Sequence, residues 1–311
     1  MTETISNESL FTATMSAGAV EEGEAFLRAN ARPLDLAWFD HANGQQVKDR
    51  VLAALAAYQA SDGGFGGGIE PDIRSPASSA LGTSVAFQYL RAVGAGSDNP
   101  VVGRAVAYLV ATVDRETWTW PIVGPRIDEA PHAPWWALDG LADRFGGFAL
   151  NPTAELLGYL FDYRRLAPGD VLEAVQQGVL GALSRNGALE SYDLLCCIRL
   201  LQTEDLPPDL RERLEARVAD ALRCADPEDP HLDLTGVLPS PRCRGYDSAR
   251  ALIGPQLDRL VSARREGGGW GPFWDWSDVD AAAWRQAERD WSGAMTARAL
   301  IALAGHGRLA D

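Results

Sequence analysis

Apolar residues recur along this chain every three or four positions, the spacing of one face of an α-helix. The clearest run lies within 47–58, where the apolar positions are Val47, Val51, Leu55 and Tyr58. Similar runs end at Gly/Pro-rich connections and predict further helices at about 81–93, 98–113, 152–165, 169–184, 188–202, 208–224, 246–263 and 292–305. No segment alternates convincingly in the manner of a strand. The pattern therefore predicts an all-α protein.

Two segments far apart in the chain share one order of features. "LAAYQASDGGFGGGIEPD" and "LVSARREGGGWGPFWDWSD" each run from a helix into Gly-Gly-aromatic-Gly, then an acidic stretch, then a helix that begins near Thr83 or Thr296. Glycines permit a sharp reversal of the chain, and the aromatic residue, Phe65 or Trp270, is expected to fill the corner. Repeated helix pairs of this kind close into a solenoid or a toroid. We expect a single toroid domain over 19–311, preceded by a flexible segment, 1–18.

The first glycine corner carries a family resemblance. Squalene-hopene cyclases repeat a Gln-x-x-Asp-Gly-Gly-Trp-Gly motif, and this chain matches it, with Phe for Trp, at Gln59, Asp62, Gly63, Gly64, Phe65 and Gly66. "GGFGGGIEP" is similar to a stretch of protein prenyltransferase β subunits, and "ERDWSGAMTARALIAL" to the closing helix of such repeats. The chain thus resembles the terpenoid cyclase and protein prenyltransferase superfamily, including single-toroid bacterial proteins described as prenyltransferase-like. The resemblance implies an (α/α)6 toroid.

Charge and composition narrow the classes of partner. The formal net charge is -15, and no basic cluster offers a surface for a polyanion, so we expect no nucleic acid partner. Lys48 is the only lysine and falls on a polar helix face, which excludes Schiff-base and P-loop lysine chemistry. The first 20 residues lack the features of a secretory signal, and no apolar run would span a bilayer. We therefore expect a cytoplasmic protein.

The sequence contains no clear ligand motif for Mg or Zn, so we expect no cofactor. Class II cyclases use an Asp-x-Asp-Asp motif, and here Asp278 and Asp280 are followed by Ala281. Protein prenyltransferases hold zinc through Asp, Cys and His, and the nearest match, Cys243 with Asp247, has no matching histidine helix. A diphosphate-bearing substrate would therefore need arginines for neutralisation.

The loop "DGGFGGGIEPDIRSP", 62–76, holds the first candidate catalytic residues. If it lies at the mouth of the ring, Asp72 enclosed by aromatic walls would keep its proton near neutral pH, with Glu70 or Arg74 orienting it. Such an acid would initiate carbocation chemistry. In the alternative interpretation, Asp72 and Arg74 form an ion pair that fixes the loop, and Glu70 is solvated.

A proline-rich segment, 118–136, supplies a third catalytic candidate, His132. This residue would act as a base or hydrogen-bond partner, or would only be satisfied by a backbone carbonyl. Tryptophans in this segment and in "GGGWGPFWDWSD" would stabilise a cation with their ring faces, stack on sugars, or fill the core. The predicted substrate-binding residues are Arg74, Arg126, Trp135, Trp136, Tyr192, Tyr246, Trp270, Phe273, Trp274 and Trp276.

Three functions remain open on this basis. The first is a terpene cyclase-like or prenyltransferase-like enzyme that starts carbocation chemistry on an isoprenoid or similar hydrophobic molecule. The second is a carbohydrate-active hydrolase or lyase, because (α/α)6 toroids also carry glycosidases with paired carboxylates. The third is a ligand-binding or scaffold protein without catalysis. A partner subunit that completes the site, as in protein prenyltransferases, is compatible with the first.

Overall fold

The computed structural model describes residues 13–185 and 187–310 of the chain, and the regular elements in these ranges are helices. The α-helices are α1 (Ala17–Asn30), α2 (Pro33–Ala42), α3 (Lys48–Ala56), α4 (Ala80–Ala92), α5 (Pro100–Thr112), α6 (Leu141–Phe145), α7 (Leu150–Asp162), α8 (Gly169–Leu183), α9 (Ser191–Leu201), α10 (Pro208–Cys224), α11 (Leu234–Val237), α12 (Tyr246–Ser262) and α13 (Ala281–Gly305). Two 3-10 turns, Ile127–Glu129 and Pro134–Trp136, lie between α5 and α6. The prediction of an all-α protein is confirmed for the described residues.

Local capping explains where several helices begin. The Ser79 hydroxyl accepts a hydrogen bond from the Gly82 N–H at 2.9 Å at the start of α4. The Asp280 carboxylate accepts two N–H bonds, from Ala282 and Ala283, and so starts α13 eleven residues before the predicted position of 292. The alanine-rich stretch that follows has high helix propensity without an apolar stripe, which is why periodicity alone placed the start too late.

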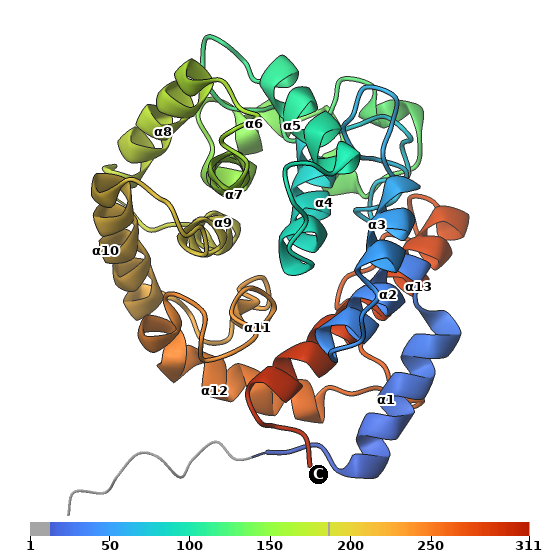
Figure 1. Ribbon diagram of the computed structural model, residues 1–311. Helices are drawn as coiled ribbons and strands as arrows, with labels where there is room; N and C mark the ends of the chain where they lie inside the picture. The colour runs from blue at the N-terminus through green and yellow to red at the C-terminus, as the bar shows by residue number, and fades with distance from the viewer. Residues whose placement is uncertain (1–12, 186, 311) are drawn as a thin grey trace, which may run out of the picture.

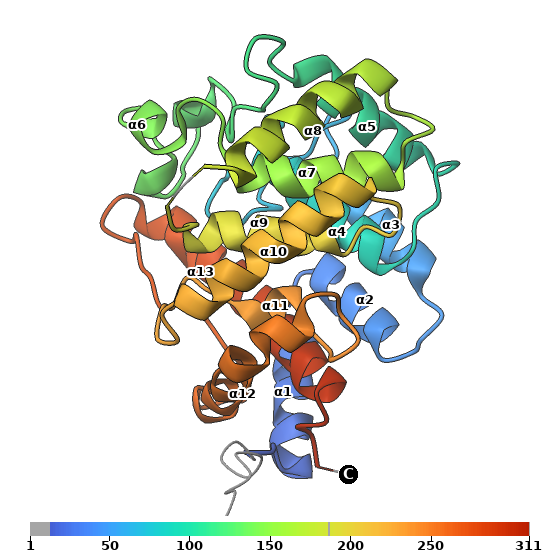
Figure 2. The same cartoon turned by 90° about the vertical axis from the view of Figure 1, so that its left-hand side faces the viewer.

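Most of the helices are arranged in an inner and an outer layer around a common centre (Figure 1). Helices α4, α7, α9 and α11 lie inside, and α5, α8, α10 and α12 lie outside them. Neighbouring inner helices contact one another from α4 through α7, α9 and α11 to α13, and α13 also packs against α2 and α1. In the side view of Figure 2, α1 and the C-terminus lie together at one end of the molecule.

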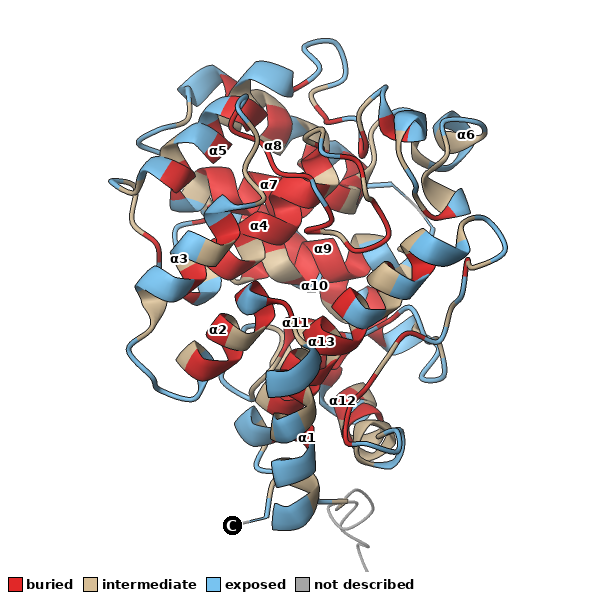
Figure 3. Ribbon diagram, turned by 90° about the vertical axis from the view of Figure 1, so that its right-hand side faces the viewer, coloured by how far each residue is buried: buried red, intermediate tan, exposed pale blue. Residues whose placement is uncertain are grey.

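The inner helices carry most of the core. Figure 3 shows buried residues concentrated on α4, α7 and α9, whereas α1 and α3 present exposed residues to solvent. Helix α7 is buried continuously from Pro152 to Leu160. The ring of its Tyr159 stacks on the ring of Phe87 in α4, with the ring centroids 5.1 Å apart. A helix buried on most sides needs neighbours on most sides, so the inner position of α7 follows from its sequence.

The N-terminal segment predicted to be flexible is described in part. Residues 1–12 lie outside the described residues, and the boundary at residue 18 falls inside α1. Met15 is 2% exposed and exchanges backbone hydrogen bonds of 2.8 Å with Arg308 and Ala310. The two ends of the described chain are therefore held against each other.

Candidate acid site at the glycine corner

The two glycine corners predicted from the sequence have the same backbone geometry. Gly63 and Gly268 have φ angles of 92° and 96°, a region that favours glycine. A Cβ on Gly63 would lie 2.4 Å from the Arg104 carbonyl oxygen, and one on Gly268 would lie 2.5 Å from that of Glu22. Each corner therefore presses its backbone against an outer helix, α5 in the first case and α1 in the second.

The corner aromatics and the threonines are also equivalent. The N–H of Phe65 donates to the Thr83 hydroxyl at 3.1 Å, and the N–H of Trp270 donates to the Thr296 hydroxyl at 3.0 Å. Both aromatic side chains are buried. These contacts confirm the internal repeat and the role of Phe65 and Trp270 as corner fillers.

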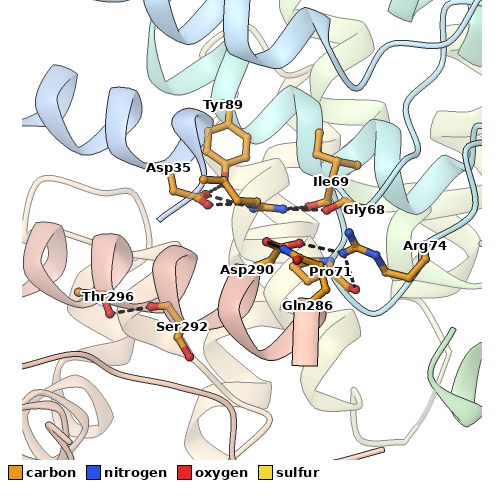
Figure 4. A network of polar contacts seen from close by, with 11 residues as sticks. Asp35, Gly68, Ile69, Pro71, Arg74, Tyr89, Gln286, Asp290, Ser292 and Thr296 are labelled. Carbon is orange, nitrogen blue, oxygen red and sulfur yellow. Dashed lines mark hydrogen bonds and ion pairs between the residues drawn. The ribbon is translucent and has the colours of Figure 1, made fainter. Parts of the chain in front are cut away.

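The loop after the first corner is folded tightly onto α2 and α4. Gly67 and Gly68 both have positive φ, and the Gly67 N–H donates to the Ser75 carbonyl at 2.7 Å. The buried Arg32 donates to the carbonyls of Gly68 and Ile69 at 2.8 and 3.1 Å (Figure 4). Arg32 is itself held by two hydrogen bonds to Asp35, which accepts a third from the Tyr89 hydroxyl. The loop is a built element and not a solvated turn.

Asp72 is enclosed by indole groups. Its side chain is 2% exposed, and its two oxygens accept hydrogen bonds from Trp276 Nε1 at 2.8 Å and Trp274 Nε1 at 3.1 Å. The Trp291 Nε1–H is buried and has no hydrogen-bond partner of its own among the described residues, yet it lies near enough to lower the pKa of Asp72. Burial outweighs these donors and raises the pKa of Asp72.

Glu70 is the strongest candidate acid in the loop. Burial raises the pKa of its carboxyl from 4.5 to about 8, and the charge of Asp72 adds to the rise, while Arg298 and Arg32 oppose it. Part of the Glu70 surface nevertheless remains accessible. The residue as a whole is therefore half-buried, and with a pKa of about 8 its carboxyl holds its proton at neutral pH. The alternative of a solvated Glu70 does not fit this environment.

Arg74 points to a different partner from the one expected. Its Nη1 donates to Asp290 on α13 at 2.8 Å and to the Pro71 carbonyl at 3.3 Å (Figure 4). The ion pair of the alternative interpretation, between Asp72 and Arg74, is therefore replaced by one between Arg74 and Asp290, while the Asp72 oxygens accept from indoles. Arg74 fixes the loop to α13.

A chain of aromatic contacts extends from Asp72 to α9. Trp274 contacts Trp291 and Phe273 with ring centroids 5.2 and 4.9 Å apart, and Phe273 contacts His231 at 5.3 Å. The Tyr192 hydroxyl lies 3.1 Å from His231 Nδ1. Tyr192 and Phe273 are 54% and 57% exposed. Partial desolvation of the Tyr192 hydroxyl, together with the negative charge of Glu70, raises the pKa of Tyr192. Predicted residues Tyr192, Phe273 and Trp274 are thus brought together with the acidic loop.

His132 supports the loop through its backbone. The segment around it pairs with the loop, since the Ala133 N–H donates to the Asp72 carbonyl at 2.9 Å. The half-buried imidazole has its Nδ1 2.8 Å from the Ala133 carbonyl and its Nε2 3.1 Å from Asp128. Its ring nitrogens are therefore used locally, as in the backbone-satisfied alternative.

The other candidates from 118–136 have partners of their own. Arg126 is exposed and forms an ion pair with Glu129. Trp136 stacks on Phe145 with centroids 6.0 Å apart, and Trp135 packs at the edge of the cluster that contains Trp276. The two tryptophans are therefore packing residues of this segment, and Arg126 is a surface residue.

Two further predicted binding residues have structural contacts of their own. Trp270 is buried in its corner, and its Nε1 donates to the Leu260 carbonyl at 2.8 Å. Tyr246 packs beside His306, with the Arg250 guanidinium over its ring. The structure therefore does not bring Trp270 or Tyr246 to the acidic loop by any contact.

Neither Arg298 nor Trp291 was predicted as a site residue, although both fall within the stretch "ERDWSGAMTARALIAL". Both lie on α13, seven positions apart and hence on one face, with the Arg298 guanidinium 6.0 Å from the Trp291 ring centroid. Arg298 forms no ion pair within the described residues, and it lowers the pKa of Glu70. The seven-residue spacing was the available signal, but an arginine at helical spacing is ordinary on a solvated face.

Two pockets lie near these elements, and neither is lined by Glu70 or Asp72. One of about 520 Å³ lies at the ends of α4, α7 and α9, and one of about 340 Å³ lies between α2 and α13. Within the described ranges, no three His, Cys, Asp or Glu side chains converge in a metal-binding arrangement. Nor does any described helix have the length and apolar character that crossing a membrane would require.

Comparison with known proteins yields no match. No protein-family model, curated protein sequence or solved structure matches this chain. The resemblance to terpenoid cyclases therefore depends on the motifs quoted above.

Proposed function

We propose that the helices form an (α/α)6 toroid. Helices α2, α4, α7, α9 and α11 would be inner members of pairs with α3, α5, α8, α10 and α12, and α13 would pair with α1 to close the ring. Support comes from the contacts of α13 with α11, α2 and α1, and from the equivalent corners that precede α4 and α13. Six pairs are the number that the resemblance implies.

We further propose that the protein is an enzyme that uses Glu70 as a general acid on an isoprenoid-like, apolar substrate. The single observation that supports this most is the half-buried Glu70, whose pKa is raised to about 8 near Asp72, a carboxyl bound by tryptophan indoles. General acids work best when their pKa lies near the operating pH. The catalytic role expected of Asp72 thus moves to its neighbour.

The chemistry of such an acid favours a substrate that carries an oxygen leaving group. A carboxyl that holds its proton at neutral pH is a weak acid, and oxygen accepts a proton more readily than an alkene carbon does. The proton of Glu70 would pass to an alcohol, ether or epoxide oxygen, the C–O bond would break with its electron pair going to oxygen, and a carbocation would remain. Arg298 and Arg32 would stabilise the carboxylate left on Glu70.

The aromatic chain suits the cation that this step creates. Indole and phenol faces attract positive charge through their quadrupoles. Trp274, Phe273 and Tyr192 retain accessible surface, which leaves their rings available to a ligand. Loss of a proton to water or capture of water by the cation would complete the reaction.

The geometry is less favourable to a glycosidase. Both mechanisms of glycoside hydrolysis need a second carboxylate that is free to attack or to activate water. Asp72 is 2% exposed and each of its oxygens accepts an indole hydrogen bond, so it is poorly placed to attack a sugar or to activate water. A carbohydrate substrate is therefore kept only as an outcome of the test.

The test combines ligand discovery with one substitution. Small molecules that co-purify with the protein are identified by mass spectrometry, and a panel of isoprenoid alcohols, ethers and epoxides is incubated with the protein. We expect turnover of a panel member, reduced by about 10²- to 10⁴-fold in Glu70→Gln. Glu116→Gln, a change of an exposed glutamate, is the control and should retain full activity.

Three results would contradict the proposal. Turnover that is equal in Glu70→Gln and Glu116→Gln would remove Glu70 from the reaction. Hydrolysis of oligosaccharides without any reaction of the isoprenoid panel would favour the carbohydrate alternative. Tight binding of a co-purified molecule that is never converted would favour a binding protein.

A further inference from the structure

A pocket of about 340 Å³ is lined by both members of the ion pair, Arg74 and Asp290, that fixes the acidic loop. Its walls come from the start of α2, the end of the helical segment at Tyr58, the glycine loop and α13. Neither Glu70 nor Asp72 lines it. Its volume lies at the lower end of the range for small-molecule sites.

Three guanidinium groups line this pocket. Arg32 directly precedes α2, Arg74 belongs to the loop 62–76, and Arg289 comes from α13. The charge of Arg32 is offset by the buried Asp35, and the charge of Arg74 by Asp290. Arg289 is exposed and, among the described residues, has no ion-pair partner, so the pocket keeps an excess positive charge.

The carboxylate in the pocket is already satisfied. One oxygen of Asp290 accepts from Arg74 Nη1 at 2.8 Å, and the other accepts from Gln286 Nε2 at 2.8 Å. The Gln286 side-chain oxygen in turn accepts from Arg289 Nη2 at 2.6 Å. Asp290 therefore orients Arg74 and Gln286 without consuming the remaining guanidinium donors.

Open donors remain on two arginines. Arg74 uses only Nη1 for its hydrogen bonds, so its Nε–H and Nη2 groups have no acceptor within the described residues. Its side chain is 22% exposed, so these donors are accessible. Arg289 likewise donates only through Nη2, so its Nε–H and Nη1 groups have no acceptor among the described residues. Fork-shaped guanidinium donors match the oxygens of a phosphate or carboxylate, and the half-buried Tyr58 gives the pocket an aromatic wall.

We propose that this pocket binds the phosphate or carboxylate group of a small organic anion between Arg74 and Arg289, separately from the acidic loop. Both arginines line the pocket, are linked through Asp290 and Gln286, and keep N–H groups without an acceptor among the described residues. Tyr58 would contact the organic part of the ligand. The site does not depend on the proposed catalytic function.

The test measures binding of inorganic phosphate and of acetate at constant ionic strength, by calorimetry and by the shift of the unfolding temperature. Binding to the folded state alone raises that temperature. We expect a response in the unmodified protein and an apparent Kd at least tenfold weaker in Arg289→Gln. Arg285→Gln removes the same charge from an exposed position of the same helix outside the pocket, and should respond like the unmodified protein.

A double variant, Arg74→Gln with Asp290→Asn, removes the buried pair together and should also lose the response. The anion that binds more tightly in the unmodified protein identifies the group of the natural ligand as phosphate or carboxylate. Absence of a response to both anions, or equal responses in Arg285→Gln and Arg289→Gln, would overturn the proposal.

Discussion

Asp72 and Glu70 are two residues apart, yet their surroundings separate their roles. Asp72 is buried against two indole donors, whereas Glu70 is half-buried and accepts no hydrogen bond from an indole. The donors favour a charged Asp72, and that charge disfavours a second one on Glu70. Together the two carboxyls therefore carry one negative charge more readily than two.

The indole bonds to Asp72 are expected to contribute measurably to stability. Trp276→Phe keeps an aromatic ring but removes the 2.8 Å donor from a buried carboxylate. We expect it to lower the free energy of unfolding by about 1–2 kcal/mol more than Trp284→Phe does. Trp284 is the matched control because its buried ring contacts Trp276 at 5.6 Å, with no hydrogen bond to Asp72. Equal losses in urea unfolding would contradict the role of the donor.

The raised pKa of Glu70 predicts how stability depends on pH. Because the folded-state pKa of about 8 exceeds the ordinary 4.5, the folded protein binds more protons than the unfolded chain between these values. Its free energy of unfolding should therefore fall as pH rises through this window, by about 1.4 kcal/mol per unit at most. Exposure and coupling to Asp72 reduce this, and we expect a total loss of about 2 kcal/mol.

Urea unfolding between pH 5.5 and 8.5 measures this dependence. In Glu70→Gln the fall should be smaller, because a glutamine does not titrate, whereas Glu116→Gln should match the unmodified protein. A profile that is flat in the unmodified protein would show that Glu70 titrates normally.

At this scale the sequence identified the acidic residues but not their partners. Glycines and prolines around Glu70 and Asp72 indicated a constrained loop. Nothing local indicated that Trp274 and Trp276, more than 200 positions away, would donate hydrogen bonds to Asp72. The ion pair of Arg74 with Asp290 was equally without a local signal. Long-range pairing of this kind has no signature in a single sequence.

At the scale of elements, the corner threonines join the helices of the repeat. Thr83 and Thr296 each accept the only hydrogen bond found for the N–H of a buried aromatic residue, Phe65 and Trp270. We expect Thr83→Val and Thr296→Val each to cost about 1–2 kcal/mol, because a buried N–H loses its acceptor. Thr112→Val, at an exposed position with only a local bond to Tyr108, should change stability by less than about 0.5 kcal/mol.

Thermal unfolding of the three variants compares these effects. Similar losses at the two corners and almost none at Thr112 would support the equivalence of the repeats. A loss at only one corner would contradict it.

Element prediction succeeded where an apolar stripe was strong. Helices α3–α5, α7–α10 and α12 lie where the periodicity placed them. Helices α1, α2, α6 and α11 were not predicted. Helix α2 is ten residues long and begins at Pro33 directly after α1, and α11 has four residues, so neither offers enough turns for a period.

At the scale of the whole molecule, α13 connects the two ends of the chain. Gly293 of α13 lies so close to the end of α1 that a Cβ would be 2.7 Å from the Ala31 Cα. We expect Gly293→Ala to lower the unfolding temperature, with a cost of about 1–3 kcal/mol, because backbone must move. Gly103→Ala in α5, where a Cβ meets nothing within 4 Å, should instead stabilise by about 0.5–1 kcal/mol.

Calorimetry of the two alanine variants tests this packing. Opposite signs are expected from the same substitution in two helices. Stabilisation by Gly293→Ala would contradict the close approach of α13 to α1.

The central claim is that Glu70 holds its proton at neutral pH beside the tryptophan-bound Asp72. The most direct measurement follows the side-chain carboxyl carbons of ¹³C-labelled glutamates by NMR from pH 4 to 9, with Glu70→Gln to identify the signal. We predict one glutamate that titrates near pH 8 and is missing from the variant. If the signal lost in Glu70→Gln titrates near 4.5 in the unmodified protein, the proposed acid and the function built on it are wrong.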